Sequence, residues 1–365
     1  MISIAKPIIG EDEIKRVVDV MNSGVIAQGA VVKEFEEKFS QFNGCAGAVA
    51  ASNGTTALHV ALMSAGVGYN DNVITTPFTF IATSNSILYC GAKPIFADID
   101  ERTFNIDPAK IEEIIESGTS VKAILIVHLY GLACDMDRIM KICQKRNITL
   151  IEDCAQAHGA TYNGRMVGTF GKSSAYSFYP TKNMTTGEGG MITSMEKEVL
   201  DEARMIREHG ANKEYLHENI GYNYRMTNIS AAIGLAQLEK LPEYNARRKK
   251  NAQYLMEELN DLDWLTLPYV PKYAGHVFHQ FTVKVKDESM RDKLAEHLRS
   301  KGVGSKVYYP MGINHQPFYK KLGYGEIKLP VTEKLAKEVL SLPIHPALIK
   351  DDLMQIKDAI RSFKI

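Results

Sequence analysis

Residues 121–152, VKAILIVHLYGLACDMDRIMKICQKRNITLIE, contain two apolar runs separated by a stretch with helical periodicity. The runs 121–127 (VKAILIV) and 148–152 (ITLIE) are apolar almost throughout, whereas residues 136–144 place apolar side chains at helical spacing. Continuously apolar strands joined by a helix are typical of a βαβ unit in a parallel sheet that is covered on both faces. We therefore predict an α/β fold.

The same alternation extends to both sides of this unit. It predicts further strands at residues 47–52, 72–76, 94–98, 175–178 and 191–194, and helices at residues 11–21, 31–42, 55–65, 79–89, 107–115 and 197–207. In sheets of this kind ligands bind at the carboxyl ends of the strands. We expect the functional residues to follow the predicted strands.

Beyond residue 228 the pattern changes. Two helices are expected at 228–241 and 244–259, separated at Leu241-Pro242 because proline disfavours helical continuation. An alternating strand at 277–285 and helices at 288–300 and 351–362 follow. We predict two domains, a large domain at residues 1–244 and a smaller α+β domain at residues 245–365.

The composition excludes several classes of protein. The chain has 365 residues with 43 Lys+Arg and 43 Asp+Glu, so a nucleic-acid partner or an anionic membrane surface is not expected. No apolar run approaches the ~18 residues of a membrane span, and the start MISIAKPIIGEDE does not resemble a signal peptide. The five scattered cysteines form no C-x-x-C pair, so we expect no disulfide framework and no metal site, and a cytoplasmic location.

Two residue types with complementary chemistry lie between residues 148 and 194. Glu152 and Asp153 end a predicted strand, and Lys182 lies among small and hydroxyl residues in SFYPTKNMTTGEGG (177–190). A pocket lysine can form an imine with a carbonyl group, and an acid can pair with a pyridinium nitrogen, which is what pyridoxal phosphate chemistry requires of a protein. The alternatives are a helix-capping acid and a solvated surface lysine.

A phosphate site is expected at the start of the helix predicted at 55–65. The stretch SNGTTAL (52–58) places a glycine and two hydroxyl residues where free backbone N–H groups and the helix dipole favour an anion. Ser177, five residues before Lys182, offers another hydroxyl group. An ordinary N-cap uses the same residues, so this motif alone does not separate the two interpretations.

Several long motifs resemble, in order, those of one known family. ASNGTTAL (51–58), TPFTFIATSNSI (76–87), VHLYG (127–131), EDCAQAHGA (152–160), SFYPTKNMTTGEGG (177–190) and GYNYRMTNISAAIGLAQLEKL (221–241) are similar to segments of the DegT/DnrJ/StrS family of pyridoxal phosphate-dependent nucleotide-sugar aminotransferases. The resemblance covers essentially the whole chain. It implies a fold-type-I transferase, with a mostly parallel seven-stranded sheet between helices in the large domain and a smaller C-terminal α+β domain.

The resemblance also implies a role for individual residues. Lys182 matches the lysine that binds pyridoxal phosphate as a covalent imine and then transfers protons, and Asp153 matches the acid at the pyridine nitrogen. The remaining cofactor residues implied are Gln156 at the phenolic oxygen, Gly54, Thr55 and Ser177 at the phosphate, Phe80 on the ring face, and Asn223 donated to the phosphate by a second subunit. A homodimer with shared active sites is the implied assembly.

Substrate contacts are expected in the second half of the chain. The candidates are Arg225, Tyr308, Tyr309 and His315, with the stretch 278–280 (FHQ) in the same substrate-facing region. For Arg225 a structural ion pair is the alternative. His158 is expected to be structural, because Lys182 already provides the acid and base.

The resemblance implies amino transfer from an amino acid, with glutamate as the expected donor, to a 3- or 4-keto group of a nucleotide-linked hexose or uronic acid. Family members that dehydrate sugars have histidine at the position of Lys182, which counts against that alternative. A cyclitol aminotransferase of the same fold, and a non-catalytic regulator that binds pyridoxal phosphate, stay open as further alternatives.

Overall fold

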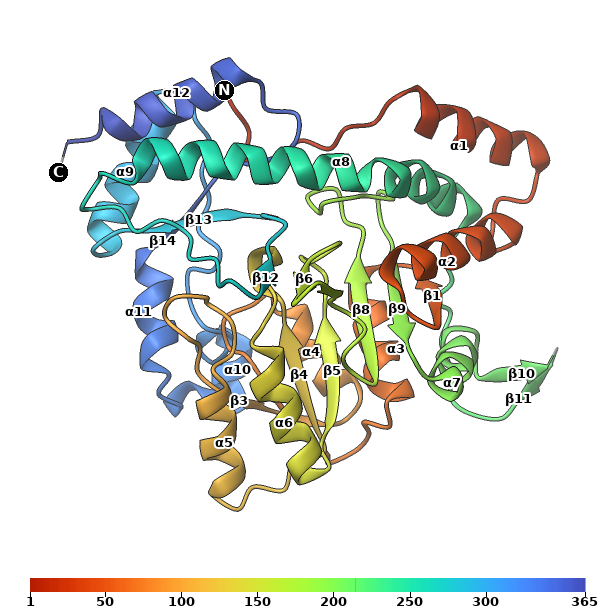
Figure 1. The fold of residues 1–365 in the computed structure, drawn as a ribbon. Coiled ribbons are helices and arrows are strands. Elements are labelled where there is room, and N and C mark those ends of the chain that lie inside the picture. The colour runs from red at the N-terminus through yellow and green to blue at the C-terminus, as the bar shows by residue number, and fades with distance from the viewer. Residues whose placement is uncertain (214, 365) are drawn as a thin grey trace.

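The computed structural model describes residues 1–213 and 215–364 (Figure 1). Its centre is a seven-stranded sheet in the order β1-β9-β8-β5-β4-β2-β3. The strands are β1 (Gly47–Ala51), β2 (Asn72–Thr75), β3 (Lys93–Phe96), β4 (Ala123–Val127), β5 (Thr149–Asp153), β8 (Ser173–Ser177) and β9 (Gly190–Ser194). Only β9 pairs antiparallel with its neighbours, so the predicted mostly parallel α/β sheet is confirmed.

Helices cover both faces of this sheet because successive strand residues point to opposite sides. Ile124 and Ile126 of β4 pack into one core, whereas Ala123 and Leu125 pack into the other. The helices of the first core are α2 (Ala30–Asn43), α5 (Pro108–Glu116), α6 (Met136–Arg146) and part of α8 (Asn228–Leu259), and those of the second are α3 (Gly54–Ser64), α4 (Ala82–Tyr89) and α7 (Lys197–Arg207).

Helix α8 differs from the prediction of two helices. It is one continuous helix with Pro242 inside it (Figure 1), so the predicted break at Leu241-Pro242 is wrong. Proline removes one backbone N–H from the helix, but Leu238, Leu241 and Tyr244 are buried on both sides of it, and α8 packs along α1 (Glu11–Ser23), α2 and α12 (Lys350–Arg361). Tertiary packing therefore outweighs the local cost of proline.

The C-terminal part of the chain has a core of its own. Strands β13 (Phe281–Lys284) and β14 (Val339–Leu342) pair antiparallel, and α9 (Glu288–Ser300) and α12 pack beside them. Ile2 joins this core and pairs with Val303, while α8 runs from the sheet into it. The division into domains at residue 245 stays a prediction.

Short elements complete the chain. They are α10 (Pro317–Lys321), α11 (Pro330–Glu338), the 3-10 turns η1 (Leu129–Gly131), η2 (Ile313–His315) and η3 (Tyr324–Glu326), the small sheet of β6 (Thr161–Tyr162), β7 (Arg165–Met166) and β12 (Ala274–Gly275), and the ribbon of β10 (Ala211–Lys213) and β11 (Leu216–His217). The strand predicted at 277–285 is shorter than expected, because Phe278 takes a left-handed φ of 46°. Among the described residues, no helix has the length and apolar character needed to cross a membrane.

Candidate active site

A cavity of about 730 Å³ lies at the carboxyl ends of the parallel strands. Its wall combines residues that follow β1, β2, β4, β5 and β8 with residues from the C-terminal part of the chain. The predicted residues that line it are Gly54, Thr55, Phe80, Asp153, Gln156, Ser177, Lys182, Tyr308 and Tyr309, together with His279 and Gln280 of the stretch 278–280. The fold therefore brings most of the predicted site together from distant parts of the sequence.

Asp153 is the last residue of β5, and its carboxylate is buried at the cavity. One oxygen accepts a hydrogen bond from the Thr83 hydroxyl (2.8 Å), and the other accepts one from the Ala155 N–H (3.0 Å). Burial raises the pKa of Asp153, while Thr83 and the nearby charge of Lys182 act to lower it. A desolvated carboxylate in this position is well suited to pair with a cation in the cavity.

The neighbouring acid Glu152 is also buried but serves the fold. Its two oxygens accept hydrogen bonds from the N–H groups of Gly168 (2.7 Å), Phe170 (2.8 Å) and Gly171 (2.7 Å), and from His128 Nε2 (2.9 Å). Although burial acts to raise the pKa of Glu152, the His128 contact and the N–H groups of Gly171 and Gly168 lower it. Its lone pairs are thus occupied by protein donors.

The start of α3 forms an anion cradle. The Asn53 side chain accepts from the Thr56 N–H (2.9 Å) and the Thr56 hydroxyl accepts from the Asn53 N–H (3.1 Å). Within the described part of the chain, the N–H groups of Gly54 and Thr55 have no hydrogen-bond partner, so they are available to an anion. A Cβ at Gly54 would lie 2.6 Å from Ser177 Cβ, so glycine allows α3 to approach β8 this closely.

Lys182 lies in the loop between β8 and β9, with its backbone N–H donating to the Tyr179 carbonyl (2.8 Å). Its side chain is half-buried in the cavity wall. Burial lowers the pKa of Lys182 to about 8, and the Asp153 carboxylate acts against this shift. The amine is therefore neutral more often near neutral pH than an ordinary lysine, and the neutral amine is the nucleophile.

Gln156 connects the sheet to the C-terminal part of the chain. Its side-chain oxygen accepts from the Tyr130 N–H (2.8 Å), and its nitrogen donates to the Tyr309 hydroxyl (3.2 Å). The Tyr130 hydroxyl in turn donates to the Tyr308 carbonyl. These bonds hold two of the predicted substrate residues against the predicted cofactor residues.

Three predicted residues lie outside the cavity that one chain forms. Asn223 is exposed and pairs with Glu208 as an isolated bridge, and Arg225 faces the same Glu208 at 3.5 Å. His315 ends the turn η2, with its Nε2 3.9 Å from a Glu333 oxygen. The roles of these residues at a ligand stay predictions. His158 is buried, and its ring packs against aromatic side chains outside the cavity lining.

The structure adds cavity residues that sequence reasoning missed. Thr83 orients Asp153, and it lies in TPFTFIATSNSI one helical turn after Thr79, whose hydroxyl is 3.1 Å from its own. Tyr179 and Lys306 also line the cavity. The i,i+4 spacing of the two threonines is a signal that could have indicated Thr83, whereas Lys306 is brought to the cavity only by the tertiary fold.

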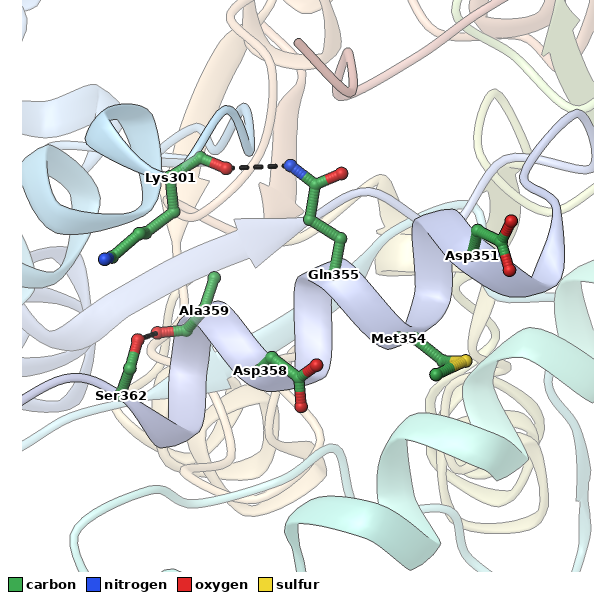
Figure 2. Close-up of a pocket in the computed structure, with 7 residues that line it drawn as sticks. All are labelled: Lys301, Asp351, Met354, Gln355, Asp358, Ala359 and Ser362. Atoms are coloured by element: carbon green, nitrogen blue, oxygen red, sulfur yellow. Dashed lines mark hydrogen bonds between the residues drawn. The ribbon is translucent and has the colours of Figure 1, made fainter.

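A second hollow of about 510 Å³ lies on α12, beside the end of α9 (Figure 2). Gln355 donates to the Lys301 carbonyl there (2.8 Å), and Asp351 and Asp358 line the same surface. None of the residues that line it belongs to the cavity described above. The groups suited to catalysis therefore gather at the sheet and not here.

Comparison with known proteins identifies the family of this chain. Residues 7–361 match the DegT/DnrJ/EryC1/StrS aminotransferase family. The chain is 42% identical to a "Pleiotropic regulatory protein" of Geobacillus stearothermophilus, and the match covers 96% of this chain and 94% of that protein. It is 40% identical to the GDP-perosamine synthase of Caulobacter vibrioides, over 98% of this chain and 97% of that protein.

A solved structure shares the whole architecture. The PLP form of Spr1654 from Streptococcus pneumoniae superposes with a TM-score of 0.93 at 28% identity, covering 99% of this chain and 98% of that one. The cavity fits this cofactor, because it offers a lysine amine, a buried carboxylate and free N–H groups at a helix start. The protein is thus a pyridoxal phosphate-dependent aminotransferase, and it belongs to the DegT/DnrJ/EryC1/StrS family.

Proposed function

We propose that this enzyme transfers an amino group from an amino acid, with glutamate as the donor, to the keto group of a nucleotide-linked sugar. The observation that carries the proposal is the presence of Lys182, Asp153 and the anion cradle at Gly54 in a single cavity. The sugar class is supported by the family match and by the name of the relative called GDP-perosamine synthase.

The roles of the residues follow from their environment. The cofactor, when bound, supplies a carbonyl carbon for the amino group and a ring that accepts electrons. Asp153 would hold a proton at the ring nitrogen, and the N–H groups of Gly54 and Thr55 would bind the phosphate with Ser177. Lys182 would take up and return protons at its Nζ, which its lowered pKa of about 8 favours. Gln156 and Phe80 would fix the ring.

The proposal includes a homodimer in which Asn223 completes the partner's cavity. Support comes from the exposed position of Asn223 and from an apolar stripe on α1, where Ile14 (54%), Val18 (48%) and Met21 (55%) are exposed. Exposed apolar stripes of this kind mark surfaces that bind a partner. Substrate contacts of Arg225, Tyr308, Tyr309 and His315, and a cytoplasmic location, belong to the same proposal.

The alternatives make different predictions. A dehydratase of the family would have histidine at position 182, and this chain has Lys182. A cyclitol aminotransferase would accept the amino group from the amino acid but would not transfer it to a nucleotide-linked sugar. The name of the Geobacillus relative is that of a regulatory protein, but the lysine and acid needed for catalysis are both present in this cavity.

Two half-reactions test the proposal. The purified protein is loaded with pyridoxal phosphate, treated with glutamate, and then presented with keto-sugar nucleotides, while the absorption of the cofactor is followed. We expect glutamate to remove the band of the lysine-bound cofactor and a keto-sugar nucleotide to restore it. Lys182→Ala should lower turnover by at least about a thousandfold.

The matched control is Lys172→Ala, which removes a lysine outside the cavity. It should leave both half-reactions unchanged. Normal turnover by Lys182→Ala would overturn the mechanism, and failure of every keto-sugar nucleotide to restore the band would overturn the substrate class.

A further inference from the structure

The C-terminal part of the chain contributes a histidine, His279, to the cavity. The proposed mechanism gives this histidine no role. His279 lines the cavity and is buried to 7% exposure. Its Nδ1 lies 3.1 Å from the side-chain oxygen of Asn183, the residue directly after Lys182. The histidine is therefore connected to the loop that carries the reactive lysine.

A chain of hydrogen bonds fixes the orientation of two amides behind His279. Asn245 of α8 donates from Nδ2 to the backbone carbonyl of His158 (2.8 Å), and a carbonyl can only accept. The Asn245 Oδ1 must then be the atom that faces Asn183, and it accepts from Asn183 Nδ2 (2.8 Å). Asn183 Nδ2 also faces the Val277 carbonyl (3.3 Å), which confirms this orientation.

These orientations fix the protonation of the His279 ring. Asn183 turns its Oδ1 to His279, and that oxygen can only accept a hydrogen bond. His279 Nδ1 must therefore carry a proton. In a neutral ring the other nitrogen, Nε2, is then an acceptor.

The surroundings keep the ring neutral and hold it in place. Burial lowers the pKa of His279 well below its usual value, and the nearby charges of Lys182 and Arg248 act in the same direction. Arg248 Nη1 faces the backbone carbonyls of Phe278 and His279, at 3.3 Å each. Nε2 has no hydrogen-bond partner among residues 1–213 and 215–364, while the side chain borders the cavity.

We infer that His279 is a substrate-binding residue whose Nε2 accepts a hydrogen bond from an N–H or O–H group of the bound substrate. The donor is either the amino group of the amino acid or a hydroxyl group of the sugar, since both carry the required hydrogen. This inference rests on the proposed amino transfer at Lys182. It predicts that the acceptor atom, and not the ring itself, matters for binding.

Two substitutions separate the two ring nitrogens. In His279→Asn, the amide nitrogen occupies a position like that of Nδ1 and retains a donor for Asn183, but the acceptor at Nε2 is lost. In His279→Gln, the longer side chain places an oxygen near the position of Nε2. We expect His279→Asn to raise KM about tenfold, the effect of one lost hydrogen bond, with little change in kcat. His279→Gln should stay within about threefold of the wild-type KM.

The two half-reactions identify the donor. If His279→Asn weakens only the change in absorption caused by glutamate, the donor is the amino group. If it weakens only the change caused by the keto-sugar nucleotide that the wild-type protein turns over, the donor is a sugar hydroxyl group. Either result supports the inference. His297→Asn, on α9 and outside the cavity, is the matched control and should change neither.

A structural role alone would give the opposite order, because His279→Asn preserves the bond to Asn183 and would then match the wild type. That order, or equal binding by both variants and the wild type, would overturn the inference. Nitrogen NMR of the histidine-labelled wild-type protein provides a readout without turnover, and a proton on Nε2 instead of Nδ1 would also overturn it. If the wild-type protein itself transfers no amino group, the proposed function fails instead.

Discussion

Two adjacent acids on one strand have different tasks, because successive strand residues point to opposite sides. Asp153 faces the cavity and accepts hydrogen bonds from Thr83 and Ala155, whereas Glu152 accepts four hydrogen bonds within the core. The strand pattern predicted a functional acid at this strand end, and the family resemblance implied that it is Asp153. The pattern alone could not show that Glu152 lies in the core, since that depends on the loop at 168–171, whose N–H groups bind its carboxylate.

We predict that Asp153→Asn impairs the reaction far more than the fold. The substitution keeps the shape but removes the charge that would pair with the protonated ring nitrogen. Loss of one partner of a buried ion pair costs about 3–5 kcal/mol, so turnover should fall by roughly a hundredfold or more. Steady-state rates at saturating cofactor provide the measurement, and a wild-type rate would remove Asp153 from the mechanism.

Glu152→Gln should have the converse effect. Each carboxylate oxygen accepts two hydrogen bonds, so the amide –NH2 would face donors with no acceptor to offer them. We expect the free energy of unfolding to fall by about 1–3 kcal/mol, since buried donors lose their partners. Urea unfolding of this variant, compared with Asp153→Asn, tests the division, and equal stability of the variant and the wild type would contradict it.

The lowered pKa of Lys182 predicts how cofactor capture depends on pH. With a pKa of about 8, roughly one amine in ten is neutral at pH 7, far more than for an ordinary lysine. The rate at which the cofactor-free protein binds pyridoxal phosphate covalently should rise with pH and level off above about 8. Stopped-flow absorption between pH 6 and 10 measures this profile.

Asp153→Asn serves as the control for that profile. The Asp153 carboxylate raises the pKa of Lys182 against the effect of burial. Removing this charge should therefore move the midpoint of the profile to lower pH. If the rate in either protein continues to rise with pH up to the pKa of an ordinary lysine, Lys182 is not desolvated.

At the scale of elements, the start of α3 carries both stability and cofactor binding. Asn53→Ala removes the cap of α3 and should cost about 1 kcal/mol of unfolding free energy, and it should also weaken cofactor binding about fivefold because the anion cradle loosens. Asp107→Ala removes the comparable cap of α5, whose side chain accepts from the Ala109 N–H (2.9 Å) outside the cavity. We expect Asp107→Ala to lose a similar amount of stability but to bind the cofactor with unchanged affinity. Equal cofactor affinities of Asn53→Ala and Asp107→Ala would contradict the role of the α3 start.

Helix α8 shows where local patterns mislead. Pro242 predicts a break, yet the helix continues because its neighbours are buried on both sides. Strands such as β4 were predictable because a continuous apolar run depends little on distant residues. In the C-terminal part of the cavity wall, Tyr309 and the stretch 278–280 were expected only from the family resemblance. Lys306 was not predicted, because its position depends on how this part packs against the sheet.

At the scale of the whole molecule, the proposed homodimer predicts complementation. Lys182→Ala and Asn223→Glu should each be inactive alone, the second because a carboxylate would repel the cofactor phosphate. In a mixed dimer one cavity combines an intact lysine with an intact asparagine. Refolding both variants together should restore about a quarter of the wild-type activity by random pairing.

Two outcomes would contradict the shared cavity. One is a mixture that stays inactive although size measurements show a dimer. The other is full activity of Asn223→Glu alone. Both are read from the same steady-state assay.

Ile2 and Ser3 pack into a part of the fold whose other residues are synthesised much later. Ile2 donates to the Gly302 carbonyl (2.8 Å) and accepts from the Gly304 N–H (2.8 Å), and the Ser3 carbonyl lies 3.1 Å from His345 Nε2. During synthesis this segment leaves the ribosome well before residues 302–304, with which it pairs and which follow it by some three hundred positions. A fragment that begins at residue 245 would lack these contacts, so excising the C-terminal part for study requires the amino terminus to be supplied with it.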